Sequence, residues 1–85
     1  MRLDKFLKVS RLIKRRTVAK EVSDAGKILV NGRTAKAATD VKVGDSLQLL
    51  FANKEVEIEI LQIAETVRAD AAKEMYRVIR ETIKS

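Results

Sequence analysis

The stretch Arg-Arg-Thr-Val-Ala-Lys-Glu-Val-Ser-Asp-Ala-Gly-Lys-Ile-Leu-Val-Asn-Gly, residues 15–32, decides the fold of this 85-residue chain. Its first half carries apolar residues on one helical face, at Val18, Ala19, Val22 and Ala25. Gly26 then supplies a C-terminal stop, since glycine accepts the left-handed conformation that ends many helices. Residues 28–30 are aliphatic and precede Asn31-Gly32, a strong hairpin signal because both positions of a type I′ turn need positive φ. The stretch therefore predicts a helix followed directly by a β-hairpin.

Upstream of this stretch, a second amphipathic pattern predicts another helix. Leu3, Phe6 and Leu7 share one helical face from Arg2 onward. In one continuous helix, Leu12 and Ile13 would point roughly 120° away from that stripe. We therefore expect a break between about Ser10 and Arg16. The second helix should begin at Arg16 or Thr17, with Thr17 as its N-cap.

Downstream, the pattern predicts three more strands and a last helix. Arg33-Thr34-Ala35 should return from the turn, and residues 46–51 and 55–63 should form two further strands. The last of these alternates acidic and apolar residues up to Ile60, where the break in period indicates a bulge or a change of buried face. Asp70 to Lys84 is predicted to be helical, with Ala72, Met75, Ile79 and Ile83 on one face. The element order predicts an α+β domain with a small, mostly antiparallel sheet.

The charge is unevenly distributed along the chain. Eighteen Lys and Arg against twelve Asp and Glu give a formal net charge of +6. Residues 1–36 hold eleven basic and three acidic side chains, a net of +8, while residues 37–85 hold seven and nine, a net of −2. A basic half of this kind favours a polyanionic partner.

Composition also argues against most enzyme classes. The chain has no cysteine and no histidine, so thiolate chemistry, the commonest general base and the commonest metal ligand are all missing. The acids Glu55, Glu57 and Glu59 are more typical of a solvated strand face than of an acid–base site. We therefore predict no catalytic residue, no metal and no cofactor. The chain also carries no apolar run of ~20 residues and no secretory signal, so a cytoplasmic protein is expected.

Eight basic residues within the first twenty positions form the predicted nucleic-acid site. Only Asp4 and Glu21 offset them, and the start of the second helix adds backbone N–H groups that favour an anion. For Asp4 two interpretations stay open: a favourable charge in the first helical turn, or an ion pair that orients Arg2 or a cation of the break. The predicted RNA-binding residues are Arg2, Asp4, Lys5, Lys8, Arg11, Lys14, Arg15, Arg16 and Lys20.

The positions of the aromatic residues favour some kinds of nucleic acid over others. Phe6 belongs to the apolar stripe, and Phe51 and Tyr76 lie outside the basic segment, so stacking of single-stranded bases is not favoured. Shape and phosphate recognition of a structured RNA fits better, with non-specific DNA binding still open. A helix-turn-helix is disfavoured because the second helix offers no Asn or Gln to read bases. Binding to a membrane surface is also disfavoured, since the basic helices lack a large exposed apolar face.

Residues 15–22, with Gly26, Val30-Asn31-Gly32 and Val43-Gly44-Asp45, resemble the S4 RNA-binding domain. The two helices and the hairpin match the αL motif of that family. The opening residues 1–12 narrow the resemblance to the short, stand-alone S4 proteins of ribosome quality control, with the small heat-shock S4 proteins more distant. The resemblance implies one S4 domain over residues 1–85, with an αL core of about 1–51 and a C-terminal strand and helix in 52–85.

The resemblance further implies a non-enzymatic factor that binds 23S rRNA of the large ribosomal subunit and P-site peptidyl-tRNA. With an RqcH-type protein, such a factor supports alanine tailing of stalled nascent chains, as a cytoplasmic, ribosome-associated monomer. Two alternatives stay open: recycling of nascent-chain-bearing subunits after heat shock, and targeting of a separate RNA-modifying enzyme. By position, Arg2 and Arg16 are the main contacts. Arg15 stands where many S4 domains have a small capping residue.

Overall fold

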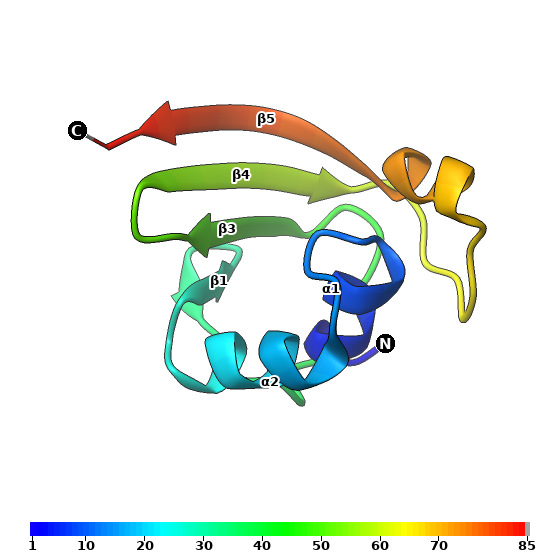
Figure 1. Ribbon diagram of the computed structural model, residues 1–85, viewed down its shortest axis with the longest axis horizontal. Coiled ribbons are helices and arrows are strands. Elements are labelled where there is room, and N and C mark those ends of the chain that lie inside the picture. Colours follow the sequence, from blue (N-terminus) through cyan, green and yellow to red (C-terminus); the bar gives the residue numbers. More distant parts are fainter. Residues whose placement is uncertain (85) are drawn as a thin grey trace.

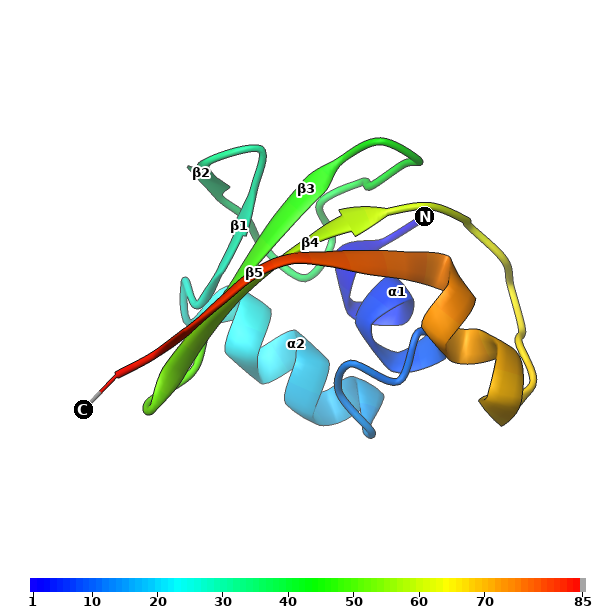
Figure 2. The same cartoon turned by 90° about the horizontal axis from the view of Figure 1, so that it is seen from above.

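The computed structural model describes residues 1–84 (Figure 1). Two α-helices come first in the chain, and the strands of the sheet follow them. The elements are α1 (Leu3–Val9), α2 (Arg16–Asp24), β1 (Ile28–Val30), β2 (Arg33–Thr34), β3 (Ser46–Leu50), β4 (Lys54–Ile60), the 3-10 helix η1 (Ala69–Met75) and β5 (Tyr76–Ile83). The strands form a five-stranded antiparallel sheet in the order β2-β1-β3-β4-β5. Figure 2 shows α1 and α2 together on one side of this sheet. The predicted α+β class is confirmed.

The core lies between the helix pair and the sheet. α1 contributes Leu3, Phe6 and Leu7, all fully buried. The sheet meets them with fully buried aliphatic residues from three strands, Ile28, Leu47, Leu49, Ile58 and Ile60. Each such side chain contributes about 1.5 to 3 kcal/mol through burial, so the alternating apolar residues of β3 and β4 fix which sheet face meets the helices.

The C-terminal end of α2 agrees with the prediction from the sequence, whereas its N-terminal cap does not. Gly26 adopts φ +79°, its N–H donates to the Ser23 carbonyl at 3.1 Å, and the Lys27 N–H donates to the Val22 carbonyl at 3.2 Å. This Schellman arrangement confirms the predicted stop. The predicted Thr17 cap is wrong: the N-cap is Arg15, in extended conformation and without a side-chain capping bond, and Thr17 lies inside the first turn.

The Asn31-Gly32 turn forms as predicted and also connects to β3. Both residues have positive φ, 52° and 83°, as a type I′ turn requires. The Asn31 amide Nδ2 donates to Asp45 Oδ1 at 3.1 Å, and its Oδ1 accepts the Ser46 N–H at 2.9 Å. The turn residue therefore fixes the start of β3 as well as the hairpin.

The predicted helix over residues 70–84 is wrong. Helical structure ends at Met75, and residues 76–83 form β5, which pairs with β4. The physical reason is that Val78, Ile79 and Ile83 are β-branched and favour a strand once a partner strand is present. Basic residues of this segment pair with acids of β4 across the strands, as Arg77 with Glu59, Arg80 with Glu57, and Lys84 with Glu55.

β4 is shorter than predicted, and the bulge expected near Ile60 lies at another position. The strand ends at Ile60 instead of Ile63, so the loss of alternation at Leu61 marks its end. The register shift against β5 falls between Glu57 and Ile58. It leaves Ile79 as the extra residue of β5, since Arg80 and Val78 pair on either side of it.

Asp45 joins the turn to β3 through a buried carboxylate. It accepts hydrogen bonds from Asn31 Nδ2, from the Lys42 N–H at 3.0 Å and from Lys42 Nζ at 3.2 Å. Burial raises the pKa of Asp45, but the bonds from Asn31 and Lys42 outweigh it and bring the pKa below its ordinary value of 3.8. A lowered pKa in the folded state means that the charged form stabilises the fold above that value.

We predict that Asp45→Asn lowers the free energy of unfolding at neutral pH by about 1.5 to 3 kcal/mol, the range for a hydrogen bond to a charged group. The difference from the parent chain should shrink as pH falls through the pKa of Asp45, because the parent loses the same charge there. Urea unfolding at neutral and acidic pH measures this. The exposed Asp40→Asn is the control, with a change of about 1 kcal/mol or less. An equal loss for Asp45→Asn at both pH values would contradict the linkage.

Candidate nucleic-acid interface

Asp4 brings two arginines from separate elements together. Its carboxylate is 2% exposed and accepts the Lys5 N–H at 2.8 Å, which fixes it in the first turn of α1. Arg2 donates from Nε to Oδ1 at 3.2 Å and from Nη2 to Oδ2 at 3.4 Å. Arg16, at the start of α2, donates from Nε to Oδ2 at 3.5 Å. Of the two interpretations of Asp4, the structure supports the ion pair that orients the arginines.

A loop on the other side of α1 holds this cluster in place. The N–H groups of Leu3 and Asp4 donate to the carbonyls of Thr39 and Ala37, at 2.8 and 3.2 Å. Asp24, the last residue of α2, accepts the Ala37 N–H at 2.9 Å. The loop at residues 37–39 therefore joins the beginning of α1 to the end of α2. Two backbone hydrogen bonds and one bond to the Asp24 side chain thus connect the element that carries Arg2 to the element that carries Arg16.

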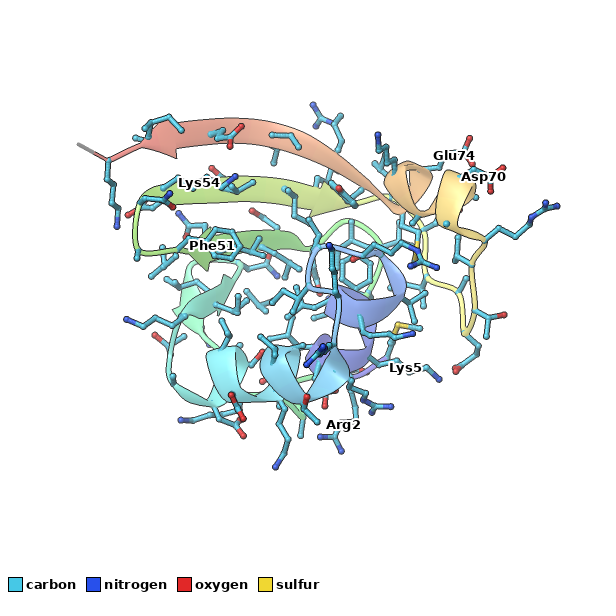
Figure 3. All side chains as sticks on the ribbon, in the orientation of Figure 1. Arg2, Lys5, Phe51, Lys54, Asp70 and Glu74 are labelled. Carbon is cyan, nitrogen blue, oxygen red and sulfur yellow. The ribbon has the colours of Figure 1, made fainter. Side chains whose placement is uncertain are left out.

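The two guanidinium groups keep free donors toward solvent. Both arginine side chains are 48% exposed although each pairs with the buried carboxylate. Figure 3 shows Arg2 and Lys5 projecting from the helix pair on the side away from the sheet. A guanidinium has five N–H donors in a planar fork suited to phosphate oxygens. The arrangement is therefore an oriented pair of guanidinium groups whose geometry suits phosphate oxygens.

The remaining predicted cations lie on the same two helices and in the connection between them. Lys8 lies on α1, Arg11 and Lys14 in the connection between the helices, and Arg15 and Lys20 at α2. All five are exposed, and within residues 1–84 none of them pairs with an acidic side chain. Lys5 is different, because it pairs with Glu65 from the segment after β4. Sixty positions separate Lys5 from Glu65, so no local sequence signal could have revealed this contact.

The connection between the helices contains a strained residue that the sequence does not reveal. Arg11 has φ +61°, the left-handed region that glycine favours at the end of a helix. Its N–H donates to the Lys8 carbonyl at 3.1 Å, and the Ile13 N–H donates to the Leu7 carbonyl at 3.0 Å. The turn buries Ile13 and leaves the Arg11 side chain exposed. An exposed arginine therefore occupies a position where glycine would be more stable.

Two negative observations complete the description of the site. Within residues 1–84, no three His, Cys, Asp or Glu side chains gather in a way that could hold a metal ion. In the same part of the chain, no helix has the length and apolar character needed to cross a bilayer.

Comparison with known proteins agrees with this geometry. Residues 1–47 match the family model of the S4 domain. The chain is 53% identical to the RQC P-site tRNA stabilizing factor of Bacillus subtilis, covering 95% of this chain and 94% of that protein. It is 59% identical to the factor of the same name from Halalkalibacterium halodurans, covering 95% and 92%. The trimeric structure of Vibrio cholerae heat shock protein 15 superposes with a TM-score of 0.85 at 34% identity, covering 92% and 80%.

The fold and its basic helix pair thus define an S4-domain protein. The chain belongs to the S4-domain family, and within that family it belongs with the RQC P-site tRNA stabilizing factors.

We predict that Arg11→Gly stabilises the domain by about 1 kcal/mol, because glycine relieves the cost of the left-handed conformation. In a chain of this length that gain raises the melting temperature by about 4 to 8 °C. Thermal unfolding followed by circular dichroism measures it. Arg11→Asn is the matched variant, since asparagine tolerates this conformation and should give a smaller gain. A destabilised Arg11→Gly variant would show that the arginine side chain itself supports the fold.

Proposed function

We propose that this protein is an RNA-binding factor of ribosome quality control that contacts P-site tRNA. The observation that carries the proposal is the pair Arg2 and Arg16 held on the buried carboxylate of Asp4, within a segment that has eight basic residues in its first twenty positions. Its relatives at 53% and 59% identity are named RQC P-site tRNA stabilizing factors. The supporting phosphate contacts are Lys5, Lys8, Arg11, Lys14, Arg15 and Lys20.

The geometry suits phosphate recognition by a preorganised surface. Arg16 gives one N–H group to Asp4 and keeps four donors, while Arg2 gives two and keeps three. Because Asp4 is buried and bonded to the backbone, the two forks lose little side-chain entropy when they meet phosphates. A surface of this kind recognises the shape of a structured RNA, since phosphate contacts fix position without reading bases.

At finer detail, we propose 23S rRNA of the large subunit and peptidyl-tRNA as the RNA partners. The protein would hold peptidyl-tRNA on an obstructed subunit while an RqcH-type protein extends the nascent chain with alanine. It acts without catalysis or cofactor, as a cytoplasmic, ribosome-associated monomer. The support for this level of detail is the identity to the named factors over nearly the whole chain.

Recycling of nascent-chain-bearing large subunits after heat shock is a second candidate. It is favoured by the likeness to heat shock protein 15 of Vibrio cholerae, at 34% identity and a TM-score of 0.85. Both candidates use the same arginine pair. A reporter that stalls in translation separates them, because loss of this protein abolishes its alanine tail under the first proposal and leaves the tail intact under the second.

We predict that Arg16→Ala abolishes co-sedimentation with large ribosomal subunits while the melting temperature stays within a few degrees of the parent. Each lost phosphate contact should also make the log–log dependence of RNA affinity on salt shallower by about 0.7 to 0.9. Filter binding of tRNA over a salt series measures this. Arg80→Ala is the matched control, because that exposed arginine lies on β5 and should leave RNA binding unchanged. Binding that survives Arg2→Ala and Arg16→Ala together would disprove the site.

We predict that Asp4→Asn weakens RNA binding by about tenfold, equivalent to 1.4 kcal/mol. Net charge alone predicts tighter RNA binding, because removing an acid makes the protein more positive. A weaker complex would therefore show that the arginines have lost their orientation. Glu21→Gln is the charge control: Glu21 is exposed on α2, and its removal should leave RNA affinity equal or higher. Equal effects of the two substitutions would exclude a positioning role for Asp4.

A further inference from the structure

β5 is a long sheet edge with its outer side open. It spans eight residues, whereas β2 at the opposite edge spans two. Figure 1 shows β5 along the border of the sheet, on the far side from the helices. An unpaired edge presents a row of free backbone N–H and C=O groups to another chain. The length of β5 makes it the stronger candidate of the two edges for pairing with a further strand.

The same strand exposes an unusual amount of apolar surface. Three of the seven large exposed hydrophobic residues described in residues 1–84 lie on β5: Val78 at 52%, Ile79 at 44% and Ile83 at 71%. Protected sheet edges usually carry charges or proline in place of aliphatic residues. The Ile79 bulge locally interrupts the edge, but it leaves Val78 and Ile83 exposed on either side. Exposed apolar residues concentrated on one strand indicate a protein-binding surface.

A groove of about 390 Å³ lies beside this strand, on the sheet face that continues the core. Tyr76 and Val78 of β5 line it together with Leu49, Phe51 and Val56. Figure 3 shows Phe51 and Lys54 beside each other at this end of the sheet, and the Lys54 ammonium stands 5.9 Å from the centre of the Phe51 ring. The groove therefore gives apolar side chains of an added segment a place to pack.

The opposite face of β5 is basic. Register places Arg77 and Arg80 opposite Glu59 and Glu57 of β4, so these arginines share the face that points away from the helices. Their side chains remain 61% and 73% exposed. β4 shows which segment fits this strand, because Lys-Glu-Val-Glu-Ile-Glu-Ile, residues 54–60, puts acids against the arginines and aliphatic residues on the other face.

We propose that the open edge of β5 binds an extended segment of a partner protein in which acidic and apolar residues alternate. The segment adds a sixth strand, with its acids toward Arg77 and Arg80 and its apolar residues beside Val78 and Ile83. RNA is disfavoured here because the edge of β5 exposes Val78 and Ile83, which an extended protein segment can cover with apolar side chains and phosphates cannot. Arg2, Asp4 and Arg16 neither lie on β5 nor line the groove, so the proposal stands or falls independently of this arginine pair.

The test uses the full chain and a capped synthetic peptide with the sequence of residues 54–60. In an NMR titration of the ¹⁵N-labelled protein, we expect shifts and slowed amide exchange over residues 76–83. A peptide of the same composition without alternation, Lys-Glu-Glu-Glu-Val-Ile-Ile, is the matched control and should bind at least tenfold more weakly. Arg16→Ala should bind the peptide like the parent, which separates this surface from the RNA site.

Substitutions on the strand then locate the binding. Ile83→Lys and Val78→Lys should each weaken peptide binding at least tenfold, and because both positions are more than half exposed the fold should persist. Val43→Lys, at a valine of 56% exposure that lies outside β5 and the groove, should have no effect. The proposal is overturned if the peptide leaves β5 unperturbed. It is equally overturned if a tRNA perturbs the amide signals of residues 76–83 more than the peptide does. A dimer in sedimentation analysis that Ile83→Lys converts to a monomer would overturn it too, because β5 would then pair with a second copy of the chain.

Discussion

A buried carboxylate between two arginines is the interaction on which the proposed RNA-binding surface depends. Asp4 is almost inaccessible to water, and an unpaired charge in that position would cost several kcal/mol. Arg2 and Arg16 supply the compensating charge from two different elements. The stability of the domain and the direction of its arginines are therefore coupled, since a conformation that releases either arginine weakens the pairing of a buried charge.

The rest of the fold separates two chemical environments. The helix pair carries the excess of positive charge, and the meander β3-β4-β5 carries acids and bases that pair across strands. The excess positive charge is therefore concentrated on the helix pair, while the charges of the sheet largely balance one another. The sheet is left to contribute its packing face to the core and its edge to other contacts.

Local signals allowed much of the N-terminal half to be predicted. Gly26 and Asn31-Gly32 occupy positions that only a few residue types tolerate, so their geometry could be read from the sequence. The basic residues of the first twenty positions and the ion pair of Asp4, one of the two interpretations of that residue, could also be predicted from the sequence. Residues 76–83 could not, because Met75, Ile79 and Ile83 satisfy a helical period while their β-branched neighbours also suit a strand. The choice depends on pairing with β4, which no local pattern encodes.

The contacts between the first residues and the loop at residues 37–41 have a consequence for the order of folding. β3 and β4 pair over 5 to 13 positions and β4 and β5 over 16 to 29, whereas the Met1 ammonium reaches Asp40 and Val41 across 39 and 40 positions. Closing a longer loop costs more entropy before any contact forms. We therefore expect the meander to form early and the seating of α1 to come last. An incompletely folded chain would then hold a sheet but lack the assembled arginine pair, so affinity for RNA would report on the completion of folding.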